Sequence, residues 1–66
     1  MGYVSKIDNM LGKKVELTVK KEALSGYFEV GTVVTITEVD QMRGYTFEDE
    51  HGNRIIEAGF GGFKEI

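Results

Sequence analysis

Apolar and polar residues alternate along the chain from residue 14 onward, a period of two that is typical of β-strands with one buried face. In KVELTVK, residues 14–20, this period places Val15, Leu17 and Val19 on one face. Four later stretches indicate strands in the same way. The strands predicted from this pattern cover residues 14–20, 32–39, 44–50, 54–60 and 63–66.

The alternation also indicates which side chains face the core. TVVTITEV, residues 32–39, is rich in β-branched residues that suit a pleated surface, and Val33, Thr35 and Thr37 are expected to point away from the core. The side chains expected to point inward from the later strands are Val34, Ile36, Tyr45, Phe47, Ile56, Ala58, Phe60, Phe63 and Ile66.

Glycine-containing segments connect the predicted strands. Residues 40–44 (DQMRG) and 49–53 (DEHGN) have the length and the glycine position of hairpin turns. Residues 21–31 (KEALSGYFEVG) do not alternate cleanly, so we expect a folded loop that is long enough to present a surface of its own. The residues expected to anchor this loop are Leu24, Phe28 and Val30.

The N-terminal segment allows two interpretations. Val4, Ile7 and Leu11 are three and four residues apart, which fits one helical turn ended by Gly12, and an extended arm fits equally. The length of 66 residues indicates one domain. We expect an arm or helical turn over residues 1–12 and a single barrel domain over residues 13–66.

The start of the chain, MGYVSKID, contains no hydrophobic signal core, and no apolar run approaches the length of a membrane span. We therefore expect a cytoplasmic protein with its natural start and end and no contact with a membrane.

The chain ends in EAGFGGFKEI, in which three glycines lie between and beside two phenylalanines. A glycine-rich phosphate site needs a helix after its glycines, and only four residues follow Gly62. We expect a tight turn instead, in which Gly61 or Gly62 has a positive φ, and where replacement of that glycine by valine destabilises the fold. Phe60 remains as the candidate functional residue of this segment.

Five short antiparallel strands in so small a chain must curl around one core and protect their edges. Their succession resembles an SH3-like barrel of the bacterial and KOW types. The resemblance lies in GTVVTI (31–36), similar to the start of a second strand, GYTFEDEHG (44–52), similar to a third strand and its turn, and GGFKEI (61–66), similar to a closing strand. It implies an all-β, five-stranded SH3-like barrel with a long loop between its first two strands. Short, acidic, cysteine-free barrels also resemble small proteins of phages or prophages of Gram-positive bacteria.

The charge distribution bears on the partner. The net charge is −3, which divides into +3 over residues 1–21 (five basic, two acidic) and −6 over residues 22–66 (three basic, nine acidic). A nucleic-acid-binding domain normally has a basic excess on one face, so the acidic balance favours a protein partner. The absence of cysteine excludes disulfides and thiolate chemistry.

The sequence contains no recognisable catalytic constellation. His51 is the single histidine, and it lies in a predicted turn without a nucleophile motif, so we expect it to be solvated. Three consecutive residues, Asp49, Glu50 and His51, do not all point at one cation in an ordinary loop. We expect no enzymatic activity, no cofactor and no metal ion.

Acidic and aromatic residues are the candidates for partner binding. Carboxylates on adjacent strands form either a solvated face or a docking surface for a basic partner. Aromatic side chains that do not fit into so small a core are candidate contact residues. The candidates for partner binding are Tyr3, Tyr27, Phe60, Glu38, Asp40, Glu48, Asp49, Glu50 and Glu57.

These features lead to two functional hypotheses. The first is a non-enzymatic protein-binding module, encoded by a phage or prophage, that docks on a bacterial host protein. The second is a nucleic-acid-binding barrel. Its contacts would be Lys6, Lys13, Lys14, Lys20 and Lys21. We expect a monomer or a weak homodimer, because an exposed edge strand can pair with its own copy.

Overall fold

A computed structural model of the chain describes residues 9–24 and 26–66. The seven strands in this part of the chain are β1 (Lys14–Leu17), β2 (Lys21–Ala23), β3 (Gly26–Phe28), β4 (Val33–Asp40), β5 (Gly44–Glu48), β6 (Arg54–Ile55) and β7 (Phe63–Glu65). The predicted all-β class is confirmed.

The N-terminal prediction falls mostly on residues 1–8, which lie outside the described residues. Next to β1, the Lys13 amide donates to the Met10 carbonyl at 3.1 Å, and Gly12 has a φ of 84°. The segment from Met10 to Lys13 is therefore a tight turn. Over residues 9–24 and 26–66, no helix has the length and apolar character needed to span a membrane.

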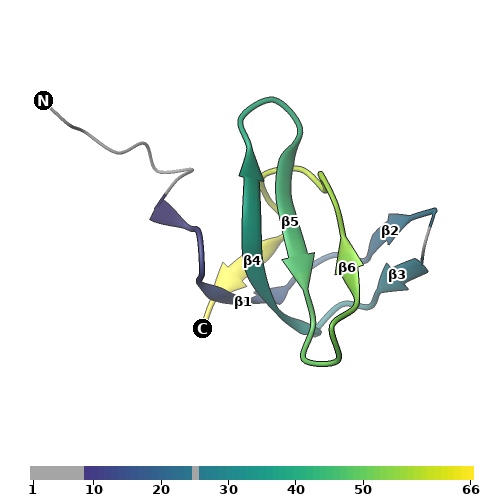
Figure 1. Cartoon of the computed structure of the whole chain (residues 1–66). Coiled ribbons are helices and arrows are strands. Elements are labelled where there is room, and N and C mark those ends of the chain that lie inside the picture. Colours follow the sequence, from purple (N-terminus) through teal and green to yellow (C-terminus); the bar gives the residue numbers. More distant parts are fainter. Residues whose placement is uncertain (1–8, 25) are drawn as a thin grey trace, which may run out of the picture.

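Five strands form one antiparallel sheet in the order β6-β5-β4-β1-β7, and β2 and β3 form a separate two-stranded ribbon (Figure 1). In Figure 1, β4, β5 and β6 stand side by side, and β1 lies across the lower end of β4. The sheet is therefore strongly curled, with β6 and β7 at its two edges. The ribbon β2–β3 stands out on the side of β6.

The long loop predicted over residues 21–31 is thus largely the β2–β3 hairpin. Only one of its three expected anchors is buried. Phe28 is 6% exposed and belongs to the core, whereas Leu24 and Val30 are exposed. Leu24 lies at the tip of the hairpin, where no sheet is within reach of its side chain.

One hydrophobic core fills the inside of the curled sheet. Val34 and Ile36 of β4 and Tyr45 and Phe47 of β5 are buried as predicted. The period of two does not hold throughout, because Thr46 is buried as well and the pairing of β4 with β5 shifts between Ile36 and Glu38. Within residues 9–24 and 26–66, the buried apolar residues of this core are Val15, Leu17, Phe28, Val34, Ile36, Tyr45, Phe47 and Ile55.

The first strand is shorter than predicted. It ends at Leu17, whose backbone bonds to Thr32 and Gly31 at 3.0 and 2.8 Å. The Thr18 amide then donates to the Gly62 carbonyl at 2.7 Å, which turns the chain away from β4. Val19 is therefore 45% exposed, and its predicted place beside Val15 and Leu17 is wrong.

In the fourth predicted strand, the prediction of the inward-facing residue is wrong by one position. Ile55 pairs with Phe47 across β5 and β6 and is buried, while Ile56 is exposed. Adjacent isoleucines leave the period ambiguous, and the pairing with β5 decides which one faces inward. The strand also ends at Ile55, and Phe60, which lies beyond it, is partly exposed. Ile66, beyond the end of β7, is exposed, so its predicted inward orientation is wrong.

Glycines shape the closing segment, residues 56–62. Gly62 has a φ of 83°, as predicted for this turn. A side chain at Gly44 would collide with the backbone of Gly59, and the two residues form a β-bridge. The closing segment can therefore cross directly over the start of β5.

Candidate functional site

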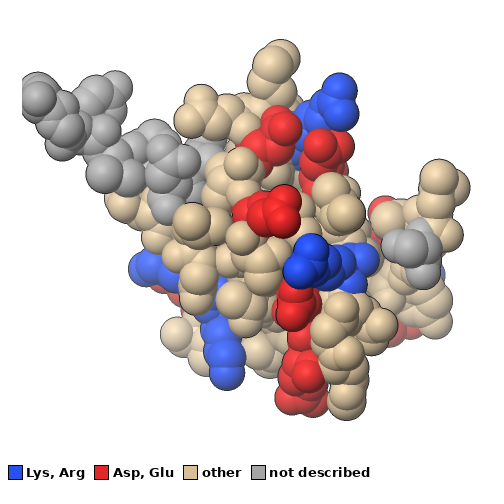
Figure 2. Space-filling model, in the orientation of Figure 1, with Lys and Arg blue, Asp and Glu red and all other residues tan. Residues whose placement is uncertain are grey.

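The predicted neighbouring strands that carry the acidic residues are indeed adjacent, as β4, β5 and β6. In Figure 2, acidic side chains are spread over β4, β5 and the β5–β6 turn, with basic side chains between them. The sheet register explains this mixture. Thr35 lies opposite Glu48, and Glu48 lies opposite Arg54. We call this side of β4, β5 and β6 the outer face.

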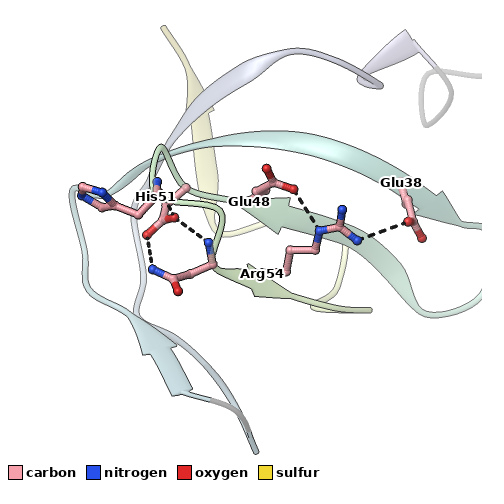
Figure 3. A network of polar contacts seen from close by, with 6 residues as sticks. Glu38, Glu48, His51 and Arg54 are labelled. Atoms are coloured by element: carbon pink, nitrogen blue, oxygen red, sulfur yellow. Dashed lines mark hydrogen bonds and ion pairs between the residues drawn. The ribbon is translucent and has the colours of Figure 1, made fainter.

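Arg54 connects two of the predicted acidic residues. Its Nε donates to Glu48 Oε1 at 2.9 Å, and its Nη1 lies 4.0 Å from Glu38 Oε2 (Figure 3). About half of the Arg54 side chain is exposed, so each ion pair contributes about 0.5 kcal/mol or less to stability. The carboxylates of the outer face are therefore partly neutralised within the molecule.

Asp40 and Asp49 each accept hydrogen bonds from the turn that follows them. Asp49 Oδ1 accepts hydrogen bonds from the amides of His51 and Asn53 at 2.9 Å, and Asp49 Oδ2 accepts one from Asn53 Nδ2 at 3.0 Å. The Asn53 side-chain bond is the largest cause that lowers the pKa of Asp49. Asp40 Oδ1 accepts from the amides of Met42 and Arg43 at 2.8 Å, and these bonds lower the pKa of Asp40.

Two shallow hollows flank the β5–β6 turn. One, of about 150 Å³, lies between β3 and β6, and the other, of about 360 Å³, lies beside Thr32 and Val33. The side chains of Glu50 and His51 stand exposed at the turn, with Glu50 Oε1 3.8 Å from His51 Nε2. Asp49 lines both hollows but already accepts three hydrogen bonds.

Tyr27 of β3 borders the smaller hollow and is 55% exposed. Lys20 Nζ lies 4.4 Å from the centre of the Tyr27 ring and 3.6 Å from Glu22 Oε2. One face of the Tyr27 ring is therefore already in contact with a cation of the same hairpin region. Tyr3, the other tyrosine predicted to bind a partner, lies outside the described residues.

Phe60 occupies a different place, in the closing segment. Its ring centre lies 5.5 Å from that of buried Tyr45, with the rings at 77°, an edge-to-face arrangement. Phe63 makes similar contacts with Tyr45 and Phe47, both at 5.7 Å. Phe60 is the outermost ring of this cluster and stays 41% exposed.

The backbone that leads into Phe60 is fixed by β5 and its preceding turn. The Ala58 amide donates to the Tyr45 carbonyl at 2.9 Å, and the Tyr45 amide donates to the Gly59 carbonyl at 2.9 Å. The Gly59 amide donates to the Arg43 carbonyl at 3.1 Å. The exposed ring therefore follows directly after two residues, Ala58 and Gly59, whose backbone is hydrogen-bonded to β5 and its preceding turn.

An ion pair joins the same two segments. Arg43 Nη1 lies 3.3 Å from Glu57 Oε2. Glu57 has a φ of 55°, the one positive value at a non-glycine position in the described part of the chain. Such a backbone is unfavourable for glutamate and persists only where neighbouring contacts hold it. The β4–β5 turn and the closing segment are thus bound together through side chains as well as backbone.

Two further apolar side chains are exposed in these segments. Met42 of the β4–β5 turn is 89% exposed, and Ile56 at the start of the closing segment is 60% exposed. We call the surface that carries Met42, Ile56 and Phe60 the loop surface. Sequence reasoning did not identify Met42 or Ile56 as exposed candidates. The signal for Met42 was its position in the middle of a predicted hairpin turn.

The predicted nucleic-acid contacts do not form one edge. Lys13 and Lys14 lie at the start of β1, and Lys20 and Lys21 lie beyond its end. Lys13 Nζ contacts Glu65 Oε1 at 3.3 Å, and Lys21 Nζ donates to the Ala58 carbonyl at 2.6 Å. Lys6 lies outside the described residues.

Within residues 9–24 and 26–66, no group of three or more histidine, aspartate or glutamate side chains is placed to hold a metal ion. Comparison with known proteins found no matching family model, no similar curated protein and no similar solved structure.

Proposed function

We propose that this protein is a non-enzymatic protein-binding module and that its partner docks on the loop surface. The observation that carries this proposal is Phe60, an aromatic ring that is 41% exposed and rests edge-on against buried Tyr45. The residue before it, Gly59, has both its amide and its carbonyl in hydrogen bonds with Arg43 and Tyr45. A partner would therefore meet a preorganised aromatic side chain.

Preorganisation is the physical reason that favours this surface. A ring held in place loses little conformational entropy when a partner covers it, and aromatic residues are enriched among those that dominate binding energy. Met42 and Ile56 add exposed apolar area in the same two segments. Exposed apolar side chains are a feature of interaction sites where they form a continuous patch.

The strand order supports an SH3-like arrangement. The sheet order β6-β5-β4-β1-β7, with a long hairpin between β1 and β4, agrees with the succession of strands that resembles SH3-like barrels. Domains of that kind bind extended peptides in aromatic grooves. We propose by analogy that a segment of the partner lies extended over the loop surface.

The charge of the protein favours a partner with a basic binding region. Residues 22–66 carry a net charge of −6, and the acidic side chains lie beside the loop surface as well as on the outer face (Figure 2). Such a field speeds association with a basic surface and makes the rate sensitive to salt.

A capture experiment with matched variants tests this proposal. The tagged protein is used to capture partners from bacterial lysate at low salt, in parallel with Phe60→Ala and Val30→Ala. Val30 is a matched control because it is also an exposed apolar residue, at 61%, but lies between β3 and β4. We expect specific partners with the wild type and with Val30→Ala, and their loss with Phe60→Ala.

Titration with a purified captured partner then measures the effect. We expect Phe60→Ala to weaken binding about tenfold or more, as for the truncation of a residue that dominates an interface. Circular dichroism verifies that the variant remains folded. Equal capture by Phe60→Ala, or no specific partner for the wild type, would overturn the proposal.

Nucleic-acid binding through the lysines stays a prediction. A gel-shift titration with single- and double-stranded DNA and RNA at low salt tests it directly. A shift that Lys13→Ala and Lys14→Ala weaken together would favour that function over the one proposed here.

A further inference from the structure

Lys21 makes an unusual contact between the β2–β3 hairpin and the closing segment. Its Nζ donates to the carbonyl of Ala58, 37 residues later in the chain, at 2.6 Å, and the bond is partly buried. The same Nζ lies 5.5 Å from the centre of the Phe47 ring. Partial burial lowers the pKa of Lys21, so the ammonium group sits at this place at an energetic cost.

With this bond, both the amide and the carbonyl of Ala58 are hydrogen-bonded. The Ala58 amide is bound to β5 through the Tyr45 carbonyl, and the Ala58 carbonyl is bound to Lys21. Two different elements thus hold Ala58 from opposite ends. The exposed ring follows only two residues later.

The glycines of the closing segment leave room for the Lys21 side chain. A Cβ built on Gly62 would lie 3.2 Å from both Cε and Nζ of Lys21, and one built on Gly59 would lie 3.8 Å from Nζ. The ammonium group therefore lies against the segment between these two glycines. The space left at these two glycines is thus next to the end of the Lys21 side chain.

We infer that Lys21 is the positioning residue of the loop surface, which holds the closing segment so that Phe60 stands on Tyr45 and is ready for a protein partner. The binding part of this inference rests on the proposed function. The structural part concerns the free protein and is tested separately. A hydrogen bond from a charged donor in a partly buried place is strong enough to select one loop conformation.

Amide hydrogen exchange of the free protein tests the structural part. Lys21→Met keeps an unbranched side chain without the donor, Lys21→Arg keeps a charged donor, and Lys20→Met is the matched control because Lys20 pairs only at the hairpin surface. With Lys21→Met we expect the amides of Ala58 and Gly59 to exchange about tenfold faster or more, relative to the Ile36 amide. Lys21→Arg should restore much of the protection, and Lys20→Met should leave it unchanged.

The same variants test the binding part with a captured partner. We expect Lys21→Met to weaken binding about tenfold and Lys21→Arg to weaken it less. If no partner is found, the exchange data still decide whether Lys21 orders the segment, so the two proposals fail separately.

Two results would overturn the inference. The first is unchanged protection of Ala58 and Gly59 in Lys21→Met, and the second is an equal loss at these amides and at Ile36, which would mean general destabilisation. If Lys21→Met does not fold, a measurement on the wild type tests the hydrogen bond from Lys21 to Ala58. A scalar coupling between Lys21 Nζ and the Ala58 carbonyl carbon by NMR is then expected, and its absence would count against the bond.

Discussion

The outer face and the loop surface differ in how far their side chains are already engaged within the molecule. On the outer face, Arg54 binds Glu48 and Glu38, and Asp49 accepts the donors of its own turn. On the loop surface, the backbone of Ala58 and Gly59 is bonded to β5 and its preceding turn, and the Phe60 ring is left 41% exposed. The charged side chains of the outer face are largely paired within the molecule, whereas the loop surface still has exposed apolar area for a partner.

This difference shows why a cluster of charges in a sequence is weak evidence for a binding site. Oppositely charged residues on adjacent strands pair with one another as soon as the sheet forms. The Phe60 ring packs with one edge on Tyr45 and still leaves 41% of the side chain exposed. The four predictions below test how strongly each region depends on its internal contacts, and they run from the largest expected effect to the smallest.

Of these variants, Gly44→Val should lower the free energy of unfolding most. Its Cβ would collide with the backbone of Gly59, and its φ of 108° is unfavourable for valine. We expect a loss of about 3 kcal/mol or more in the free energy of unfolding, which is most of the stability of a domain this small. Urea denaturation followed by circular dichroism measures it.

The matched control for this change is Gly52→Ala in the β5–β6 turn. Gly52 also has a positive φ, of 86°, but has open space around it. Its substitution should cost about 1 kcal/mol. Equal losses for the two variants would mean that the crossing of Gly44 and Gly59 contributes nothing beyond backbone strain.

Gly62→Val should cost about 2 kcal/mol in unfolding free energy. A Cβ at Gly62 would lie 2.6 Å from Val19 Cγ2, and its φ is 83°. Gly61→Val is the control, because Gly61 has neither a positive φ nor a close neighbour. Thermal unfolding of both variants checks the prediction. A larger loss for Gly61→Val than for Gly62→Val would contradict the geometry of the closing segment.

Acid should weaken the turns that the aspartates hold. Hydrogen bonds lower the pKa of Asp40 and Asp49 below the ordinary value of 3.8, so each carboxylate stabilises the folded state at neutral pH. This contribution is complete well above pH 3.8 and is lost as the pH falls through the lower pKa of the folded state. Melting temperatures between pH 6 and pH 2 should therefore fall less steeply for Asp49→Asn than for the wild type. An identical slope would mean that the Asp49 bonds do not contribute.

Arg54→Ala should have the smallest effect on stability. The Arg54 side chain is 52% exposed, so we expect a loss of about 0.5 kcal/mol that shrinks at high salt. Urea denaturation at low and high ionic strength measures this difference. A loss above about 2 kcal/mol would show that the charges of the outer face do more than neutralise one another.

The parts of the fold that sequence could predict are those governed by local period. β4 and β5 keep their alternation over enough residues to identify Val34, Ile36, Tyr45 and Phe47 as core. The sequence could not predict where the chain leaves the sheet. That depends on bonds between distant segments, such as the one from Thr18 to Gly62 that turns Val19 outward.

The candidate surfaces were predictable to a similar degree. The neighbouring positions of Glu38 and Glu48 followed from the hairpin pattern. The pairing of Arg54 with both glutamates required the register. The contact of Lys21 with Ala58 has no local signal, because 37 residues separate the two.

The position of β7 at the edge of the sheet affects how the protein meets its own copies at high concentration. An edge strand invites a second copy to pair with it antiparallel across a two-fold axis. With the axis at Lys64, each lysine would face its counterpart, and with the axis at Glu65, two glutamates would face each other. Like charges directly opposite are unfavourable. Two neighbouring side chains of opposite sign therefore disfavour the pairing of β7 with its own copy in both of these registers.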